Sequence, residues 1–248
     1  PPDLVRRLQP VVPQARIFSP YGATEALPLT VIEGGEIESC AEATESGGGV
    51  CVGRPLREVQ VRVIQVTSAE LEASALIDLP AGLIGEIVAT GPMVTKAYDR
   101  RKEATRKAKI FDGERVWHRM GDLGFFDEEG RLWFCGRVAE RVVTASGEEF
   151  HPECCEQIFN QHPRVYRTAL IGMGPATRRV PGIVVQPRAG EFPRNGDETT
   201  AWVEELRKLG SQSPKTAAIR HFFFRREFPV DVRHNAKLNR LRLSKEYA

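Results

Sequence analysis

The sequence predicts a chain of the mixed α/β and α+β class, with a distorted, barrel-like β part followed by a small α+β domain. Strand patterns and glycine-bounded turns dominate residues 1–137. From residue 138 to 248, amphipathic helical patterns alternate with strands. A length of 248 residues suits one large or two smaller domains. We therefore predict two domains, 1–137 and 138–248, joined near residues 136–141.

Three patterns predict the strands of the first part. Residues 58–63 alternate strictly between polar and apolar types, which indicates a strand with one buried face. Residues 85–91 form a second strand pattern with a glycine at each end. Residues 124–136 predict a β-hairpin, because the turn Asp127-Glu-Glu-Gly130 places glycine where a left-handed residue is needed. We expect these strands to build a small, barrel-like subdomain.

The second part predicts two helices and three strands. Pro152 stands in the first turn of a short helix that extends to Gln161. A longer amphipathic helix covers 197–209, with Asp197 or Thr199 as its N-cap and Gly210 as its stop. The predicted strands are 166–172, paired with 182–186, and a third at 221–224; the polar connections 175–181 and 187–196 are expected to be surface loops.

Composition excludes several classes of protein. Lys plus Arg (35) nearly balance Asp plus Glu (33), so nucleic acid is not expected as the main partner. The more basic stretch 215–245 is either a solvated face or a surface that attracts phosphates. The five cysteines include no C-x-x-C pair, and the five histidines show no metal-ligand spacing. With no apolar run near the ~18 residues of a membrane span, we expect a cytoplasmic protein with reduced thiols.

Several short motifs occur in a distinctive order. Tyr21-Gly-Ala-Thr-Glu25 comes first, Arg119-Met-Gly-Asp122 leads into the hairpin, and Cys135-Gly-Arg137 ends it. Lys237 follows more than a hundred residues beyond Asp122, within residues 229–240. Each motif alone would be a weak signal. Together they resemble the adenylate-forming superfamily of acyl-CoA synthetases, luciferases and peptide-synthetase adenylation domains, which activate a carboxylate with ATP to give an acyl-AMP and pyrophosphate.

The resemblance implies different roles for the two parts of the chain. Residues 1–137 would be the C-terminal part of a large AMP-binding domain, and 138–248 a small, mobile lid domain that carries the catalytic lysine. Family members place a Ser/Thr/Gly-rich phosphate loop upstream of the first motif. The glycine cluster at 47–49 has no following Lys and opens no helix, so it does not fit that loop. We therefore expect a C-terminal piece of a larger enzyme, which alone would not turn over ATP.

The first motif implies contacts with ATP and Mg²⁺. In the family, the aromatic residue of the block containing Tyr21 and Gly22 packs on adenine, Thr24 contacts the α-phosphate, and Glu25 helps to hold Mg²⁺. The chemistry agrees, since a carboxylate is the hard oxygen ligand that Mg²⁺ prefers beside phosphates. The alternative is an ordinary surface turn.

Three further residues carry implied roles. Asp122 would accept hydrogen bonds from both ribose hydroxyls, as a carboxylate can. Arg137 would reach the ribose or phosphates with a forked, permanently charged group. Lys237 would be the catalytic lysine, whose ammonium neutralises charge that develops as the carboxylate attacks phosphorus. The alternatives are a hairpin cap, a solvated strand end and an exposed lysine in a basic tail.

The sequence departs from the family pattern around the junction and the lysine. Ala236 stands where Gly usually precedes the lysine, and Ala139 where a charged hinge residue is usual. Val143 stands where many relatives have Lys, and one extra residue lies between Arg137 and Gly147. Because the domain rotation that permits thioester formation runs through this hinge, these changes put the thioester half-reaction in doubt more than the adenylation.

Residues 154–172, 134–137 and 233–237 are more similar to the β-lactone synthetases of bacterial long-chain olefin biosynthesis than to the usual acyl-CoA synthetases. Those enzymes adenylate a 2-alkyl-3-hydroxy fatty acid, and the 3-hydroxyl then displaces AMP, a step that needs no CoA. The resemblance implies this substrate and, as further partners, other enzymes of the olefin pathway. Two alternatives stay open: a thioester-forming acyl-CoA synthetase or relative, and a non-catalytic nucleotide-binding or docking protein.

Overall fold

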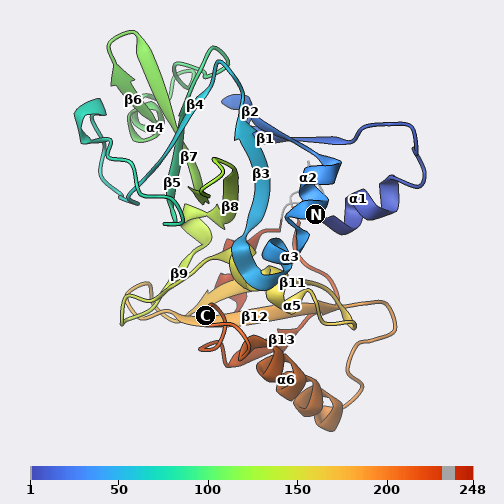
Figure 1. Ribbon diagram of the computed structural model, residues 1–248. Helices are drawn as coiled ribbons and strands as arrows, with labels where there is room; N and C mark the ends of the chain where they lie inside the picture. Colours follow the sequence, from blue (N-terminus) through green and yellow to red (C-terminus); the bar gives the residue numbers. More distant parts are fainter. Residues whose placement is uncertain (1, 231–237, 248) are drawn as a thin grey trace. The chain divides into compact units, whose positions relative to one another are not determined.

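A computed structural model describes residues 2–230 and 238–247 (Figure 1). The chain forms two compact units. The first contains the residues up to Glu42 together with Gly49–Val138. The second contains Ala43–Gly48 and the residues from Ala139 onward.

The first unit is built on an eight-stranded sheet with the order β1-β2-β3-β8-β7-β5-β4, and β6 pairs with β7. Within the described residues β1 and β4 are the ends of this order and do not pair with each other, so the sheet is open. The expected barrel-like part is thus a distorted sheet that does not close into a barrel, with register shifts at several strand pairs. The strands are β1 (Phe18–Ala23), β2 (Ala26–Glu33), β3 (Val50–Pro55), β4 (Gln60–Ile64), β5 (Gly85–Thr90), β6 (Lys109–Asp112), β7 (Arg115–Phe126) and β8 (Leu132–Arg137).

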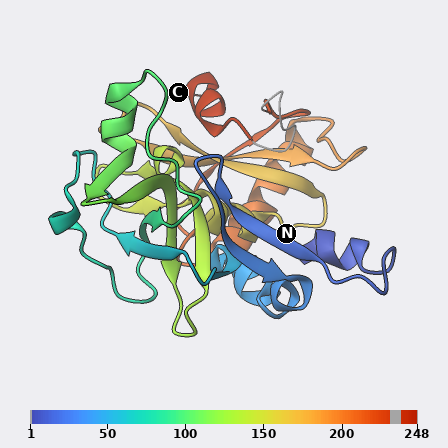
Figure 2. The same ribbon diagram turned by 90° about the horizontal axis from the view of Figure 1, so that it is seen from above.

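Short helices flank this sheet. α4 lies beside β6 and β7, as seen from above in Figure 2, and α1 packs against α2. The helical segments of this unit are α1 (Pro2–Leu8), α2 (Gly34–Ser39), η2 (Ala73–Ala75) and α4 (Lys102–Ala108). The short segments α3 (Ala41–Ala43) and η3 (Val138–Glu140) stand where the chain passes between units.

The three predicted strand patterns of the first part are confirmed, with small shifts in their bounds. β4 begins two residues later than predicted. β5 is buried along its whole length: Ile87 and Ala89 pack in one cluster and Val88 in another, so both faces of the strand are covered. The hairpin joins β7 and β8, and Gly130 takes the left-handed conformation that its turn requires (φ 73°).

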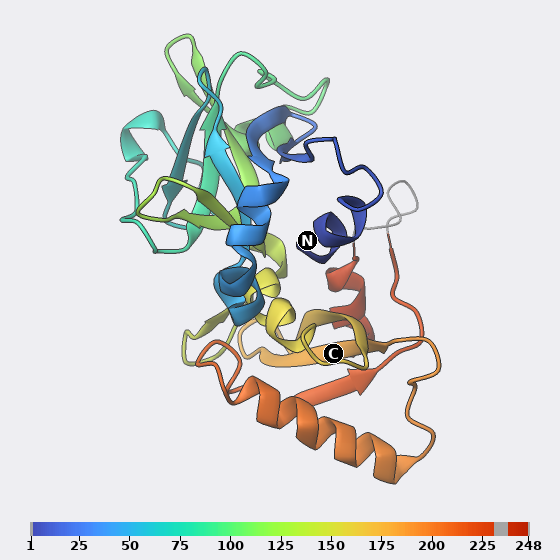
Figure 3. The ribbon, with the colours of Figure 1, turned by 45° about the vertical axis from the view of Figure 1, so that its right-hand side comes forward.

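The second unit is a three-stranded sheet covered by helices. β11 and β12 pair, as predicted, and run antiparallel, while β13 pairs parallel to β12. Helices α5 and α6 cover one face and α7 the other. Figure 3 shows the unit from a second direction, with α6 below the strands. The elements are β9 (Val142–Val143), β10 (Glu149–Phe150), α5 (Pro152–Phe159), β11 (Val165–Met173), β12 (Val180–Pro187), α6 (Gly196–Gly210), β13 (His221–Phe224) and α7 (Arg240–Glu246).

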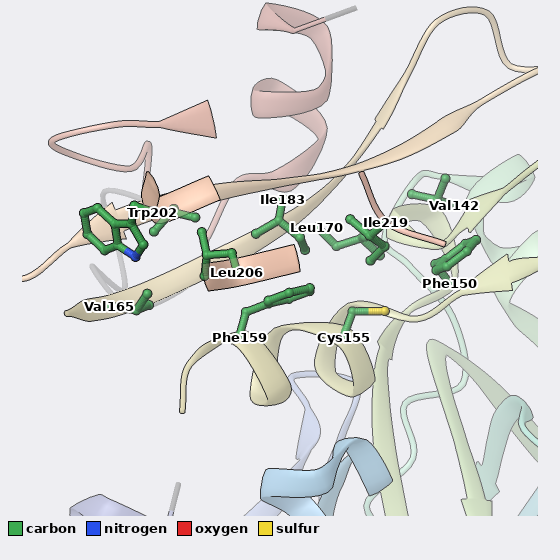
Figure 4. Close-up of a cluster of buried hydrophobic side chains, with 11 residues drawn as sticks. Val142, Phe150, Cys155, Phe159, Val165, Leu170, Ile183, Trp202, Leu206 and Ile219 are labelled. Carbon is green, nitrogen blue, oxygen red and sulfur yellow. The ribbon is translucent and has the colours of Figure 1, made fainter. Parts of the chain in front are cut away.

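The core of this unit lies between the sheet and the two helices α5 and α6 (Figure 4). Phe159 of α5 and Trp202 and Leu206 of α6 are fully buried there. Strand alternation divides the sheet residues, since Leu170 and Ile183 face this core while Ile171 and Val184 face α7.

The N-cap predicted for the long helix is wrong. Asn195, not Asp197 or Thr199, caps α6: its backbone is extended and its side chain accepts a hydrogen bond at 2.9 Å from the amide N–H of Glu198. The helix ends at Gly210, as predicted, and a Cβ there would lie 2.9 Å from the ring of Phe159. Close packing of α6 on α5 therefore adds to the reasons for glycine at this position.

The glycine cluster at 47–49 has a packing role. η1 (Thr44–Gly48) packs against α5. Gly47 is left-handed (φ 89°), and a Cβ there would lie 2.7 Å from the carbonyl oxygen of Cys154. The ammonium of Lys215 donates a hydrogen bond to the carbonyl oxygen of Gly47. These contacts explain why residues 43–48 belong to the second unit.

Candidate functional site

Three motif residues from distant parts of the sequence meet in the first unit. The phenol of Tyr21 donates a hydrogen bond to Oδ2 of Asp122 at 2.7 Å. Arg137, which stands opposite Asp122 in the β7–β8 register, donates to Oδ1 at 2.6 Å and to the carbonyl oxygen of Met120 at 3.1 Å. Asp122 is buried, whereas about half of the Arg137 side chain is exposed. The arrangement places a buried carboxylate under an accessible cation.

Tyr21 is held on two sides. Its ring packs against Phe134 with 5.8 Å between centroids, and its hydroxyl points to Asp122. Burial and the neighbouring Asp122 carboxylate raise the pKa of Tyr21 well above its ordinary value. Tyr21 is therefore a neutral hydrogen-bond donor that orients Asp122, an arrangement that the sequence did not predict.

Arg119, from the same motif as Asp122, points to a different environment. Its guanidinium forms an ion pair with buried Glu86 at 2.6 Å and donates to the carbonyl oxygens of Thr67 and Ala69. It ties β7 to β5 and to the segment before η2. Its role in the described structure is to hold the strand that carries Asp122.

Glu25 lies at the turn between β1 and β2, near Tyr98 and Lys109. Although burial disfavours its charged form, a hydrogen bond from Tyr98 and the positive field of Lys109 help to bring the pKa of Glu25 below its ordinary value. Burial, followed by the bond to Glu25, raises the pKa of Tyr98 to about 12. Arg137 also contributes to the pKa of Tyr98, so this group adjoins the Asp122 site.

Of the other predicted residues, Thr24 is exposed in the same turn as Glu25. Gly22 lies at the irregular point of the β1–β2 pairing, and a Cβ there would lie 2.4 Å from the carbonyl oxygen of Ala26. Ala139 is exposed in η3, and Val143 pairs with Glu149 in the β9–β10 ladder. Lys237, the predicted catalytic lysine, lies outside the described residues, as does Ala236.

Sequence reasoning did not nominate the residues around Glu25. Tyr98, Lys109 and His118 lie in three separate segments of the sequence, and none belongs to a motif named above. The one available signal was Lys109 between Ala108 and Ile110, a charge within a short strand-like run. Only the pairing of β6 with β7 places it opposite His118.

Two features are absent from the described residues. Across residues 2–230 and 238–247, no group of three or more His, Cys, Asp or Glu side chains is arranged to hold a metal ion. In the same part of the chain, no helix combines the length and apolar character needed to cross a membrane.

Comparison with known proteins agrees with the motifs. No family model matches the chain. An olefin β-lactone synthetase of Xanthomonas campestris pv. campestris is 45% identical over 98% of the chain and 44% of that protein. One of Stenotrophomonas maltophilia is 43% identical over the same shares. The chain thus spans less than half the length of these curated relatives.

Solved structures share the fold. The amide bond synthetase McbA of Marinactinospora thermotolerans superposes with a TM-score of 0.76 at 23% identity, covering all of this chain and 45% of that one. ATP-bound MatB of Rhodopseudomonas palustris gives a TM-score of 0.72 at 24% identity, over 99% and 43%.

The motifs, their meeting at Asp122 and these similarities define the class: the chain belongs to the adenylate-forming superfamily. Within that superfamily it is similar, over nearly all of its length, to the olefin β-lactone synthetases.

Proposed function

We propose that the protein adenylates a 2-alkyl-3-hydroxy fatty acid with ATP and closes the product to a β-lactone, in long-chain olefin biosynthesis. The identities of 45% and 43% to olefin β-lactone synthetases extend over 98% of the chain and support this choice. The resemblance at 154–172, 134–137 and 233–237 favours the same branch.

One observation carries the adenylation half of the proposal. Tyr21, Asp122 and Arg137 come from three separate motifs, and their side chains join in one hydrogen-bonded group. A buried carboxylate held by a neutral phenol is a suitable acceptor for ribose hydroxyls. An accessible guanidinium beside it suits phosphate oxygens. When a nucleotide binds, its ribose would take over part of the hydrogen bonding at Asp122.

The proposed first step forms the acyl adenylate. An oxygen of the substrate carboxylate attacks the α-phosphorus of ATP, and the bond from that phosphorus to pyrophosphate breaks. Thr24 would contact the α-phosphate, while Arg137 and Lys237 would stabilise the negative charge on it. The exposed position of Thr24 and the partly exposed Arg137 are compatible with these roles.

The proposed second step needs no external nucleophile. The oxygen of the substrate's 3-hydroxyl attacks the acyl carbon, the bond from that carbon to the AMP oxygen breaks, and the hydroxyl proton is released. The product is a four-membered lactone, with AMP as the leaving group. Because nucleophile and electrophile belong to one molecule, the step is unimolecular.

Glu25 fits the implied Mg²⁺. Its pKa is lowered in the described structure, so its carboxylate is ionised near neutral pH and offers the hard oxygen that Mg²⁺ binds. The metal would neutralise charge on the phosphates. In this chain we assign Glu25 as the candidate ligand and no other residue.

Thioester formation is the second candidate, because relatives of that kind match half of the chain. A 2-succinylbenzoate–CoA ligase of Bacillus cytotoxicus is 34% identical over 50% of it, and a 4-chlorobenzoate–CoA ligase of Arthrobacter is 39% identical over 46%. The exposed Ala139, at the position of the usual charged hinge residue, favours the lactone over the thioester.

The deciding experiment uses the complete protein that carries these 248 residues. It would be incubated with ATP, Mg²⁺ and a 2-alkyl-3-hydroxy fatty acid, with and without CoA, and the product identified by NMR. We expect a β-lactone in both reactions. A thioester that forms only with CoA, with no lactone in either reaction, would assign the protein to the acyl-CoA synthetases instead.

A further inference from the structure

Lys109 is a buried cation that none of the motifs explains. It begins β6 and is only 2% exposed. In the β6–β7 ladder it stands directly opposite His118, so both side chains lie on the same face of the sheet. A buried charge costs stability unless it is well paired, and an apolar side chain of similar size would avoid that cost. The position therefore calls for a reason beyond packing.

The contacts of Lys109 lead to Glu25. Its ammonium donates a hydrogen bond to Oγ1 of Thr95 at 3.1 Å. The backbone N–H of Thr95 in turn donates to the carbonyl oxygen of Glu25 at 2.9 Å. Three residues later, Tyr98 places its ring 5.8 Å from the ammonium and hydrogen-bonds the Glu25 carboxylate with its hydroxyl. The segment 95–98 thus connects the buried lysine to both the backbone and the side chain of Glu25.

Lys109 and His118 both lie close enough to Glu25 to act on its carboxylate. Burial lowers the pKa of Lys109, and the field of Glu25 acts in the opposite direction. His118 holds a proton on Nδ1, which donates to the carbonyl oxygen of Ala108 at 3.1 Å. Burial and the neighbouring Lys109 lower the pKa of His118, so the imidazole is neutral at neutral pH. The Glu25 carboxylate, the Tyr98 phenol, the Lys109 ammonium and the His118 imidazole thus form one polar group, which adjoins Arg137.

We propose that Lys109 is a positioning residue for Glu25: anchored on Thr95 and facing Tyr98, its ammonium holds the Glu25 carboxylate in the orientation that engages the magnesium–nucleotide complex. The proposal rests on the assignment of Glu25 under the proposed function. It gives Lys109 no contact with substrate. Its effect is confined to ligands that bring a divalent cation.

Because Lys109 should affect only ligands that bring a divalent cation, binding measurements alone can test its role. AMP without metal would use the Tyr21–Asp122–Arg137 group, whereas ATP with Mg²⁺ would also use Glu25. In the complete protein, calorimetry would compare the wild type with Lys109→Met for both ligands. We expect the variant to bind Mg²⁺–ATP at least tenfold more weakly and metal-free AMP within twofold of the wild type. Thermal unfolding should show a midpoint that is unchanged or higher.

Lys107→Met is the matched control. Lys107 lies two residues earlier, in the last turn of α4; it is about two-thirds exposed and pairs along the helix surface with Glu103. It should change neither affinity. Lys109→Arg keeps the charge and should recover part of the Mg²⁺–ATP affinity.

Two results would overturn the proposal. One is Mg²⁺–ATP binding by Lys109→Met equal to that of the wild type. The other is an equal loss of both ligands with a lower unfolding midpoint, which would make Lys109 a structural residue only. Wild-type protein that binds neither nucleotide would overturn the proposed function as well, whereas a thioester product would leave the assignment of Lys109 intact.

Discussion

Tyr21 and Asp122 are 101 residues apart in the sequence, yet the phenol of one donates to the carboxylate of the other at 2.7 Å. Tyr21 lies in β1, at one end of the sheet, and Asp122 in β7, four places along the strand order. The bond can form only when the strands between them have bent the sheet. The bond therefore links the fold of the first unit to the geometry of the candidate nucleotide site.

Replacing Tyr21 with Phe should lower the stability of the first unit and weaken nucleotide binding. A hydrogen bond to a charged group contributes about 1.5–3 kcal/mol, and its loss leaves a buried carboxylate with one donor fewer. We expect a loss of stability of that size in urea unfolding, together with weaker AMP binding by calorimetry. Tyr166→Phe is the control, because Tyr166 is more than half exposed. If the two variants behave alike, the Tyr21–Asp122 bond has no such importance.

Arg240 should be the most sensitive charged residue of the second unit. It lies at the start of α7 with about 13% of its side chain exposed, and it forms ion pairs with three carboxylates, those of Glu140, Glu153 and Glu156. Arg240→Met leaves these carboxylates without their shared cation, and breaking such a buried pair costs about 3–5 kcal/mol. The free energy of unfolding measures this. Arg242→Met, at a mostly exposed i,i+4 pair with Glu246, should cost about 0.5 kcal/mol or less.

Glu156 should make the stability of the second unit depend on pH. Burial raises its pKa from 4.5 to about 7, against the opposing effect of Arg240. The folded state therefore binds this proton more tightly than the unfolded state. The resulting stabilisation is fully present below pH 4.5 and is lost as the pH rises to about 7.

Glu156→Gln tests this dependence, because glutamine keeps the shape but does not titrate. Unfolding free energies of wild type and variant would be measured from pH 4.5 to 8. The wild-type value minus the variant value should fall as the pH rises to about 7 and then level off. A difference that rises with pH, or stays constant, would contradict the raised pKa.

Gly47→Ala should destabilise the second unit. The new Cβ would lie 2.7 Å from the carbonyl oxygen of Cys154, in a backbone with φ 89°. Left-handed strain alone costs roughly 1–2 kcal/mol for an L-residue, and the clash adds to it. Gly35→Ala is the control, since nothing lies within 4 Å of a Cβ in α2; alanine there should be neutral or stabilising. Equal unfolding midpoints for the two variants would count against the close packing of η1 on α5.

Local patterns were sufficient to predict some elements of the first unit and most of the larger ones of the second, but not β1, β2, β3 or α7. The β7–β8 hairpin, α5 and the β11–β12 pair follow from glycine turns, a proline at a helix start and alternation. The cap of α6 did not, because Asn195, Asp197 and Thr199 can all cap a helix and only the extended backbone at Asn195 decides among them. The sheet of the first unit was predicted as barrel-like because strand patterns do not reveal whether the edge strands pair.

The residues of the candidate site were also only partly predictable from the sequence. Tyr21, Asp122 and Arg137 were nominated from motifs, and the structure brings them together. Lys109 was not, since a lysine in a short strand normally points to solvent and only its register with His118 places it inside. The role of Lys237 stays a prediction from the sequence.

The parallel pairing of β13 with β12 affects how the second unit folds during its synthesis. β11 and β12 can pair once residue 187 has left the ribosome, but β13 completes the sheet only after α6 and residue 224 have followed. Until then, β12 has an edge of unpaired backbone N–H and C=O groups, which other chains can join. A ribosome-bound intermediate, or a chain cut before His221, should therefore be especially prone to aggregation.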